Sequence, residues 1–252
     1  MRLVRFRFGD RIATGVADED SIRVLQGTFF ENPVPTGEEV PIDDTRLLAP
    51  VLPSKVIGIG LNYPAHAEEF GQSIPEEPLL FLKPATSVSG PGDPIPLHPL
   101  SERVDYEGEL AVVIGRLARR LGEEDASKAI LGYTCGNDVT LRDLQSKDDQ
   151  WTRAKGFDGS NPLGPWIETG VDPSDIALET RVNGETRQSS RTSDLAVGPA
   201  GLVAFISLYM TLLPGDVIMT GTPAGVGPLQ PGDHVEIEIE GIGVLDNRAV
   251  EG

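Results

Sequence analysis

The sequence predicts a mainly β protein of the α+β class, with short helices and a small β-rich module at the N-terminus. Glycine (29) and proline (21) together supply 50 of the 252 residues, a share typical of many tight turns or of disorder. Disorder is excluded by regular apolar patterns. In residues 1–10 and 234–240, apolar and charged side chains alternate as they do in strands with one buried face.

Residues 1–52 are expected to form the N-terminal module. Strands are predicted at residues 1–9, 12–17 and 21–25, with a turn at Gly9 and Asp10. The prolines that follow predict an extended connection, and we place the boundary to a main domain, residues 53–252, near Pro50 to Pro53.

The main domain is predicted to alternate short strands with short helices and ordered loops. Strands are expected at residues 55–60, 79–83, 133–139, 216–220 and 234–240, with a hairpin at 177–189 around Asn183 and Gly184. Helices are expected at residues 64–70, 123–131, 141–145 and 199–211. Residues 87–99 and 151–165 have no period and are interpreted as loops.

Two carboxylates in the strand-like run after Val104 are the strongest chemical signal. Glu107 and Glu109 are two residues apart, so in a strand both point to one face, about 7 Å apart. The continuously apolar residues 110–114 indicate that this strand enters a core, and Asp138 follows another β run. Like charges there repel unless a cation lies between them. A solvated strand face, as at residues 236–240, remains the alternative.

These three side chains offer only oxygen ligands, which suit Mg²⁺, Mn²⁺ or Ca²⁺ and not Zn²⁺. Three carboxylates around a divalent ion leave a net charge of −1. An anionic substrate therefore needs further cations close by, and Arg142 and Lys155 are the candidates.

His66 and Glu69 share one face of a short predicted helix. The pair suits a general base and the carboxylate that orients it. The alternative is a surface ion pair worth about 0.2–0.5 kcal/mol. The glycine-rich residues 221–227 lack the Gly-Lys-Ser/Thr of a phosphate loop, which argues against nucleotide binding. Thr222 in that loop could hydrogen-bond a carboxylate.

Composition limits the partners. The net charge is −18 and the isoelectric point about 4.5, so no basic surface for nucleic acid or an anionic membrane is expected. Cys135 is the single cysteine, which excludes an intramolecular disulfide. With neither a signal-peptide pattern nor an apolar run of about 18 residues, we expect a cytoplasmic protein that acts on or binds a small molecule.

Ordered motifs over residues 55–248 resemble the fumarylacetoacetate hydrolase family. They include I-G-L-N-Y-P-A-H-A-E-E, F-L-K-P, D-Y-E-G-E-L-A-V-V-I-G, G-N-D-V-T-L-R-D-L-Q, A-K-G-F-D and L-P-G-D-V-I-M-T-G-T-P-A-G-V-G. The resemblance implies a mixed β-roll or β-sandwich core with short helices for the catalytic domain, usually as a homodimer. It also implies reactions of 2-oxo acids that carry a further carbonyl.

Site residues follow from the same resemblance. Glu107, Glu109 and Asp138 would bind Mg²⁺ or Mn²⁺, and His66 with Glu69 would activate water. The residues that would hold substrate oxygens are Arg142, Gln145, Lys155 and Thr222, and Lys155 would also share the charge of the departing enolate.

The leading hypothesis is therefore a metal-dependent hydrolase that cleaves a C–C bond in acylpyruvate-type 2,4-dioxo acids. With only about fifty residues ahead of the core, fumarylacetoacetate is less expected than a small acylpyruvate or oxaloacetate. The alternatives within the family are a 2-hydroxyhepta-2,4-diene-1,7-dioate isomerase and an oxaloacetate decarboxylase. An alternative from another class is a non-catalytic, metal-dependent keto-acid-binding protein.

Overall fold

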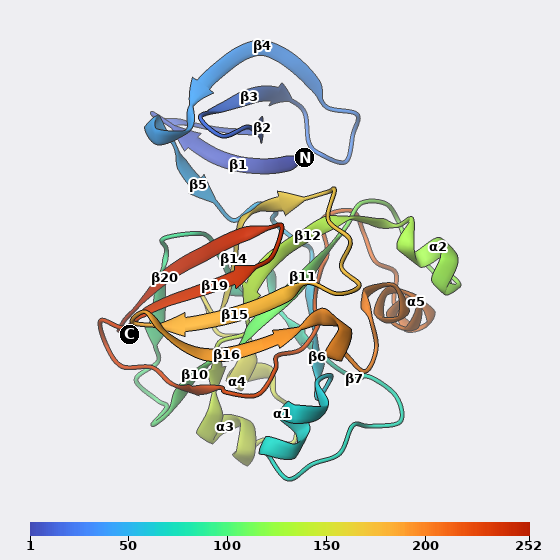
Figure 1. Cartoon of the computed structure of the whole chain (residues 1–252), viewed down its shortest axis with the longest axis vertical. Coiled ribbons are helices and arrows are strands. Elements are labelled where there is room, and N and C mark those ends of the chain that lie inside the picture. The colour runs from blue at the N-terminus through green and yellow to red at the C-terminus, as the bar shows by residue number, and fades with distance from the viewer.

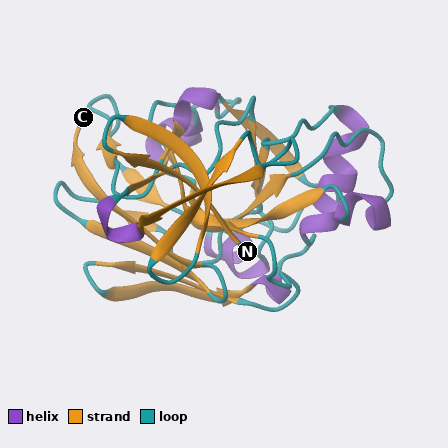
Figure 2. Ribbon diagram, turned by 90° about the horizontal axis from the view of Figure 1, so that it is seen from above, coloured by secondary structure: helices purple, strands orange, loops and turns teal.

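Strands dominate the structure, as the sequence predicts. The computed structural model describes residues 1–252. Its strands form a 12-stranded, a 5-stranded and a 3-stranded sheet. A small β-rich module stands at one end of the body in Figure 1, and Figure 2 shows the short helices around the periphery of the strands. The predicted α+β class with few, short helices is confirmed.

The N-terminal module is an antiparallel meander. Its strands are β1 (Arg2–Phe8), β2 (Arg11–Ala17), β3 (Ser21–Gln26), β4 (Val34–Pro41) and β5 (Arg46–Leu48). The predicted extended connection after residue 33 is wrong where β4 lies. Because β4 is an edge strand with a single partner, β3, its prolines are tolerated although they cannot donate hydrogen bonds.

The module and the main body share one sheet, since β1 pairs with β14 through Leu3 and Ile167. From β1 the strand order continues β14-β12-β11-β17-β6-β7. The bounds are β14 (Asn161–Glu168), β12 (Ile130–Asn137), β11 (Gly108–Ile114), β17 (Val217–Met219), β6 (Val56–Gly60), β7 (Leu79–Lys83) and β8 (Val88–Ser89), which pairs with β14. All seven residues of β11 are buried, which explains its apolar run.

The 5-stranded sheet contains the predicted hairpin. Its order is β16 (Glu185–Arg191), β15 (Ala177–Val182), β19 (His234–Ile239), β20 (Gly243–Glu251) and β9 (Pro94–Leu97). Asn183 and Gly184 both have left-handed φ angles, 54° and 77°, as the predicted type I′ turn requires. The predicted loop at residues 87–99 is wrong where β9 lies, again an edge strand that tolerates proline.

The helices are α1 (Pro64–Glu69), α2 (Glu123–Ser127), α3 (Arg142–Lys147), α4 (Thr152–Lys155) and α5 (Pro199–Tyr209). The predicted helix at residues 123–131 is too long, because Ile130 already pairs with Ile114 in β12. The predicted loop at residues 151–165 instead contains α4 and the start of β14. None of these helices has the length and apolarity needed to cross a membrane.

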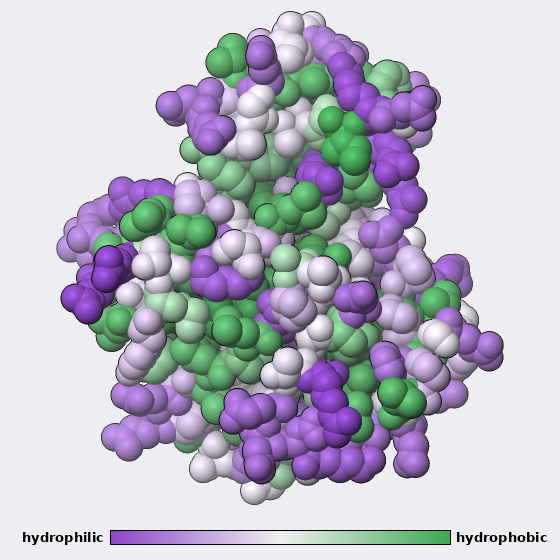
Figure 3. All heavy atoms as spheres, turned by 180° about the vertical axis from the view of Figure 1, so that it is seen from behind, coloured by the Kyte–Doolittle hydropathy of each residue, from purple (hydrophilic) through white to green (hydrophobic).

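The position of Glu107 follows from the 3-stranded sheet. It consists of β13 (Thr140–Leu141), β10 (Val104–Tyr106) and β18 (Gly227–Pro228). The chain leaves this sheet after Tyr106 and enters the large sheet at Gly108. Glu107 therefore lies between two strands, not within one continuous strand as expected. Seen from behind the view of Figure 1, the surface of the molecule carries mixed polar and apolar side chains, with the N-terminal module at the top (Figure 3).

Candidate active site

A cavity of about 660 Å³ opens between β6 with α1 on one side and α3 with α4 on the other. Seven of the nine predicted site residues line it: His66, Glu107, Glu109, Arg142, Gln145, Lys155 and Thr222. The other two, Glu69 and Asp138, contact lining residues directly. The fold thus brings all nine into one place from six separate segments.

Glu107, Glu109 and Asp138, here called the acidic trio, have ligand oxygens within 4.8 Å of one another. They are only 3%, 2% and 1% exposed, which rules out the solvated strand face. The strand register explains why the three carboxylates lie close together. Glu109 pairs with Gly136 across β11 and β12, and the backbone N–H of Asp138 donates to the carbonyl of Glu107 at 2.9 Å.

The acidic trio fits a hard divalent cation by its donor chemistry. Burial, together with the charges of Asp138 and Glu107, raises the pKa of Glu109 well above its usual value. The N–H of Gly221 donates to Glu109 at 2.8 Å, but this single hydrogen bond does not offset the burial. A cation held by these oxygens would favour the charged form of Glu109.

Two lysines contact the acidic trio. Lys155, at the end of α4, contacts Glu107 and Asp138, both at 2.7 Å. Lys83, at the end of β7, is fully buried and pairs with Asp138, and it also donates to the carbonyl of Ser160 at 2.9 Å. Burial lowers the pKa of Lys83. For Lys155 burial acts in the same direction, but Asp138 and Glu107 outweigh it and raise the pKa.

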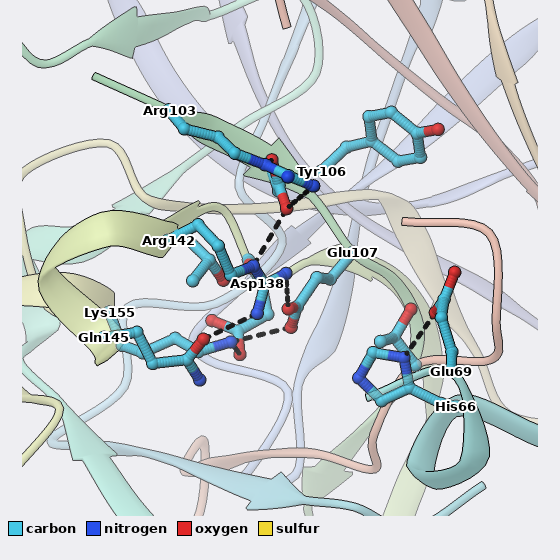
Figure 4. Close-up of polar contacts among 12 residues, drawn as sticks. His66, Glu69, Arg103, Tyr106, Glu107, Asp138, Arg142, Gln145 and Lys155 are labelled. Carbon is cyan, nitrogen blue, oxygen red and sulfur yellow. Dashed lines mark hydrogen bonds and ion pairs between the residues drawn. The ribbon is translucent and has the colours of Figure 1, made fainter. Parts of the chain in front are cut away.

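Arg142 connects the trio to a fourth buried acid, Asp105. Its guanidinium donates to Glu107 at 2.6 Å, to Asp105 at 2.8 Å and to Gln145 at 2.6 Å (Figure 4). Burial raises the pKa of Glu107, but Lys155 and Arg142 outweigh burial and hold it at about 2. Glu107 is therefore a carboxylate throughout the physiological range.

His66 and Glu69 form the predicted pair on α1. The distance between His66 Nδ1 and Glu69 Oε2 is 3.2 Å, and the second carboxylate oxygen accepts the N–H of Gly225 at 3.1 Å. Gly225 is held in turn, since its carbonyl accepts the hydroxyl of Tyr106 at 2.9 Å. In Figure 4 the other ring nitrogen of His66 points away from Glu69, toward the side of Glu107.

Thr222 lies against the trio, but its hydroxyl is already engaged. It donates to the carbonyl of Gly108 at 2.9 Å and accepts from the side chain of Gln188 at 2.7 Å. A hydroxyl has one donor. Hydrogen bonding to a substrate carboxylate, as expected from the sequence, would require Thr222 to release Gly108, so its role stays a prediction.

Comparison with known proteins identifies the family. The description "Fumarylacetoacetate (FAA) hydrolase C-terminal" matches residues 55–250, and "Rv2993c-like, N-terminal" matches residues 1–50. The chain belongs to the fumarylacetoacetate hydrolase family. The resemblance that the sequence motifs carry is therefore confirmed.

Named relatives of the chain include isomerases, a tautomerase and a fumarylacetoacetate hydrolase. The structure of a 5-carboxymethyl-2-hydroxymuconate delta-isomerase from Mycobacterium smegmatis has a TM-score of 0.95 and 50% identity, covering 100% of both chains. A 2-hydroxyhepta-2,4-diene-1,7-dioate isomerase from Mycobacterium marinum has a TM-score of 0.93 and 46% identity, covering 100% of this chain and 98% of that one. A human mitochondrial oxaloacetate tautomerase is 41% identical over 84% of this chain and 71% of its own length.

Three polar residues of the site were missed by sequence reasoning: Lys83, Arg103 and Asp105. Lys83 was visible only as the lysine of the F-L-K-P motif, to which no role was given. Arg103 and Asp105 are two residues apart, the spacing of side chains that share one face of a strand, although Arg103 itself precedes β10. That spacing was the available signal for an ion pair next to the acidic trio.

Proposed function

We propose that this family enzyme is a divalent-cation-dependent isomerase or tautomerase of small 2-oxo acids that works through an enolate. The observation that carries the proposal is the His66–Glu69 pair beside a cavity that also contains the acidic trio and Lys155. The pair suits a proton acceptor, and the buried cation site suits a substrate that becomes more negative during reaction. The relatives named as isomerases and as a tautomerase support placing isomerisation or tautomerisation ahead of hydrolysis.

In the proposed reaction His66 carries the proton. Held through Nδ1 by Glu69, its other nitrogen accepts a proton from the carbon beside the 2-oxo group. Glu69 stabilises the resulting imidazolium. The same nitrogen then returns the proton at a different carbon or oxygen atom, so that one bond to hydrogen breaks, another forms, and no oxidant or reductant is required.

Other residues of the chain would stabilise the enolate and hold the substrate. A divalent cation bound by the acidic trio would supply Lewis-acid stabilisation of a 2-oxo acid. Lys155 places its ammonium beside two trio carboxylates, where it would attract a developing oxyanion. Arg142 keeps N–H groups beyond its contacts to Asp105, Glu107 and Gln145, and these would bind the substrate carboxylate.

Hydrolysis of a 2,4-dioxo acid is the second candidate, because the His66–Glu69 pair also suits activation of a water molecule. It would break the C–C bond next to the distal carbonyl and leave the same kind of enolate. A decarboxylase would need no such base, and a non-catalytic binding protein would need none either. A requirement for His66 therefore separates the isomerase and the hydrolase from the decarboxylase and the binding protein.

We also propose a homodimer. β7 is the terminal strand of the large sheet and exposes Leu79 and Leu82. Such an apolar edge is unfavourable in water and suits contact with a second copy. Sedimentation of the purified protein would test this arrangement.

The proposed function is tested with oxaloacetate and acetylpyruvate, each with Mg²⁺ or with EDTA. We expect the wild type to speed the enol-to-keto conversion of oxaloacetate, and to exchange its C3 hydrogens in D₂O, only with Mg²⁺. His66→Asn should lower both rates by about 10²- to 10⁴-fold, whereas the control His234→Gln should not. An unchanged rate in His66→Asn would contradict the proposal. Cleavage of acetylpyruvate to acetate and pyruvate at a higher rate would favour hydrolysis instead.

A further inference from the structure

Seven charged side chains form a continuous series of ion pairs through the site, here called the ion-pair chain. In order they are Arg103, Asp105, Arg142, Glu107, Lys155, Asp138 and Lys83. Four are cations and three are anions, so the series has a net charge of +1. It begins and ends with a cation, but only one end reaches solvent. Lys83 is fully buried, whereas the side chain of Arg103 is 47% exposed at the mouth of the cavity.

Asp105 holds the exposed end in place. Its carboxylate is completely buried and accepts Nε and Nη2 of Arg103 at 2.8 and 3.0 Å, as well as Nε of Arg142 at 2.8 Å. One buried acid thus holds two guanidinium groups side by side. Such two-bond pairing fixes the plane of the Arg103 guanidinium. Its Nη1 has no hydrogen-bond partner in the protein and remains available for an anion.

No nearby acid pairs with the free Nη1 of Arg103. The carboxylate of Asp143 is engaged by Ser101 and by Lys147. Both oxygens of Glu69 are engaged by His66 and Gly225. Glu102 is exposed to solvent at the rim, where water and salt screen its charge.

The size of the cavity points to a substrate that extends toward Arg103. At about 660 Å³ it lies in the range of pockets for larger ligands. A four-carbon acid with its 2-oxo end at the acidic trio would leave most of that volume unfilled. Arg142 contacts Glu107 directly, and Arg103 lies two ion pairs further out, through Asp105. A second anionic group several carbons from the 2-oxo group would meet Arg103.

We propose that Arg103 determines specificity by binding the distal carboxylate of a 2-oxo dicarboxylic acid several carbons long, while Asp105 positions it. This inference rests on the proposed function, since it places the 2-oxo end of the same substrate at the acidic trio. Arg103 discriminates between substrates of equal length by charge. It takes no part in moving the proton.

The test is a matched pair of ligands, 2-oxoadipate and 2-oxohexanoate, which differ only in the distal carboxylate. Their dissociation constants are measured by calorimetry with Mg²⁺, independently of turnover. We expect the wild type to bind 2-oxoadipate at least tenfold more tightly, a difference of about 1.4 kcal/mol. In Arg103→Met the preference should fall to about onefold, with 2-oxohexanoate affinity unchanged.

Two further variants complete the experiment. Arg103→Lys, which keeps the charge, should retain a clear preference for 2-oxoadipate. Arg119→Met removes an exposed charge elsewhere and should leave the preference intact. Equal binding of the two acids by the wild type, or an undiminished preference in Arg103→Met, would overturn the role of Arg103 while leaving the proposed function standing. Failure of both acids to bind with Mg²⁺ would overturn this inference, whereas the proposed function is decided by the experiment with oxaloacetate.

Discussion

Glu109→Gln should separate the loss of stability caused by burying the acidic trio from the ability of the trio to bind a divalent cation. In the protein without a divalent ion, the buried Glu109 is held beside Asp138 and Glu107, and its pKa is raised well above the usual value. The folded protein therefore holds this proton more tightly than the unfolded chain does. Stability is lost as the pH rises above the usual carboxyl range. A neutral glutamine removes this loss and can still accept the N–H of Gly221.

The expected shifts follow from binding linkage. A cation at a hundred times its dissociation constant stabilises the wild type by about 2.7 kcal/mol. At about 2–4 °C per kcal/mol for a chain of this size, Tm should rise by roughly 5–10 °C. If loss of one ligand weakens binding about a hundredfold, the stabilisation falls to about 0.4 kcal/mol, a shift below roughly 2 °C.

Differential scanning fluorimetry at pH 8 with EDTA, and with increasing Mg²⁺ or Mn²⁺, measures both effects. Glu109→Gln should melt no lower than the wild type in EDTA and should respond weakly to either ion. The control Glu19→Gln, at an exposed turn of the N-terminal module, should behave like the wild type in both conditions. The reasoning would be refuted if Glu109→Gln melted several degrees lower in EDTA, or if it kept the full response to the ions.

Three other predictions follow from buried contacts. Lys83→Met leaves Asp138 with Lys155 alone and the Ser160 carbonyl with only the backbone N–H of Val139. The substitution should cost about 3 kcal/mol, measured as the free energy of unfolding in urea with EDTA. A loss below about 1 kcal/mol would contradict the pairing. Binding of Mg²⁺ should release a proton, because it favours ionised Glu109; calorimetry in buffers of different ionisation enthalpy should show release that decreases as the pH rises. Gly225→Ala should slow catalysis but preserve Mg²⁺ binding. A Cβ at φ +102° would lie 2.1 Å from the carbonyl oxygen of Arg187 and would displace the N–H that holds Glu69. Equal losses of catalysis and of Mg²⁺ affinity would contradict this prediction.

Local patterns were enough to predict part of the site. The two-residue spacing of Glu107 and Glu109, the apolar run after them and a third acid after another strand all indicated one buried acidic cluster. His66 and Glu69 are neighbours on one helix, so their pairing depends only on helix geometry. In each case the partners are close in sequence, or the burial of their strand is evident from its composition.

Long-range pairing could not be predicted in the same way. Lys83 contacts Asp138 across 55 residues, and a lysine at the end of a strand normally reaches solvent. The strands β4 and β9 were missed because proline indicates a loop when the neighbouring strands are unknown. Their prolines are acceptable only because each lies at the edge of a sheet. That property belongs to the assembled sheet, not to the segment.

The loop after β17 links the two halves of the chemistry. The N–H of Gly221 holds Glu109 of the acidic trio, and the N–H of Gly225 holds Glu69, which pairs with the proposed base His66. Both glycines have left-handed φ angles, 99° and 102°, which other residues adopt at a cost. Because these two contacts lie four positions apart in one loop, a displacement of the whole loop would disturb the proposed cation site and the proposed base together, whereas a local shift at Gly225 would disturb only the base. We infer that the glycine-rich pattern, which a phosphate loop would share, serves here to keep two carboxylates in a constant relative position.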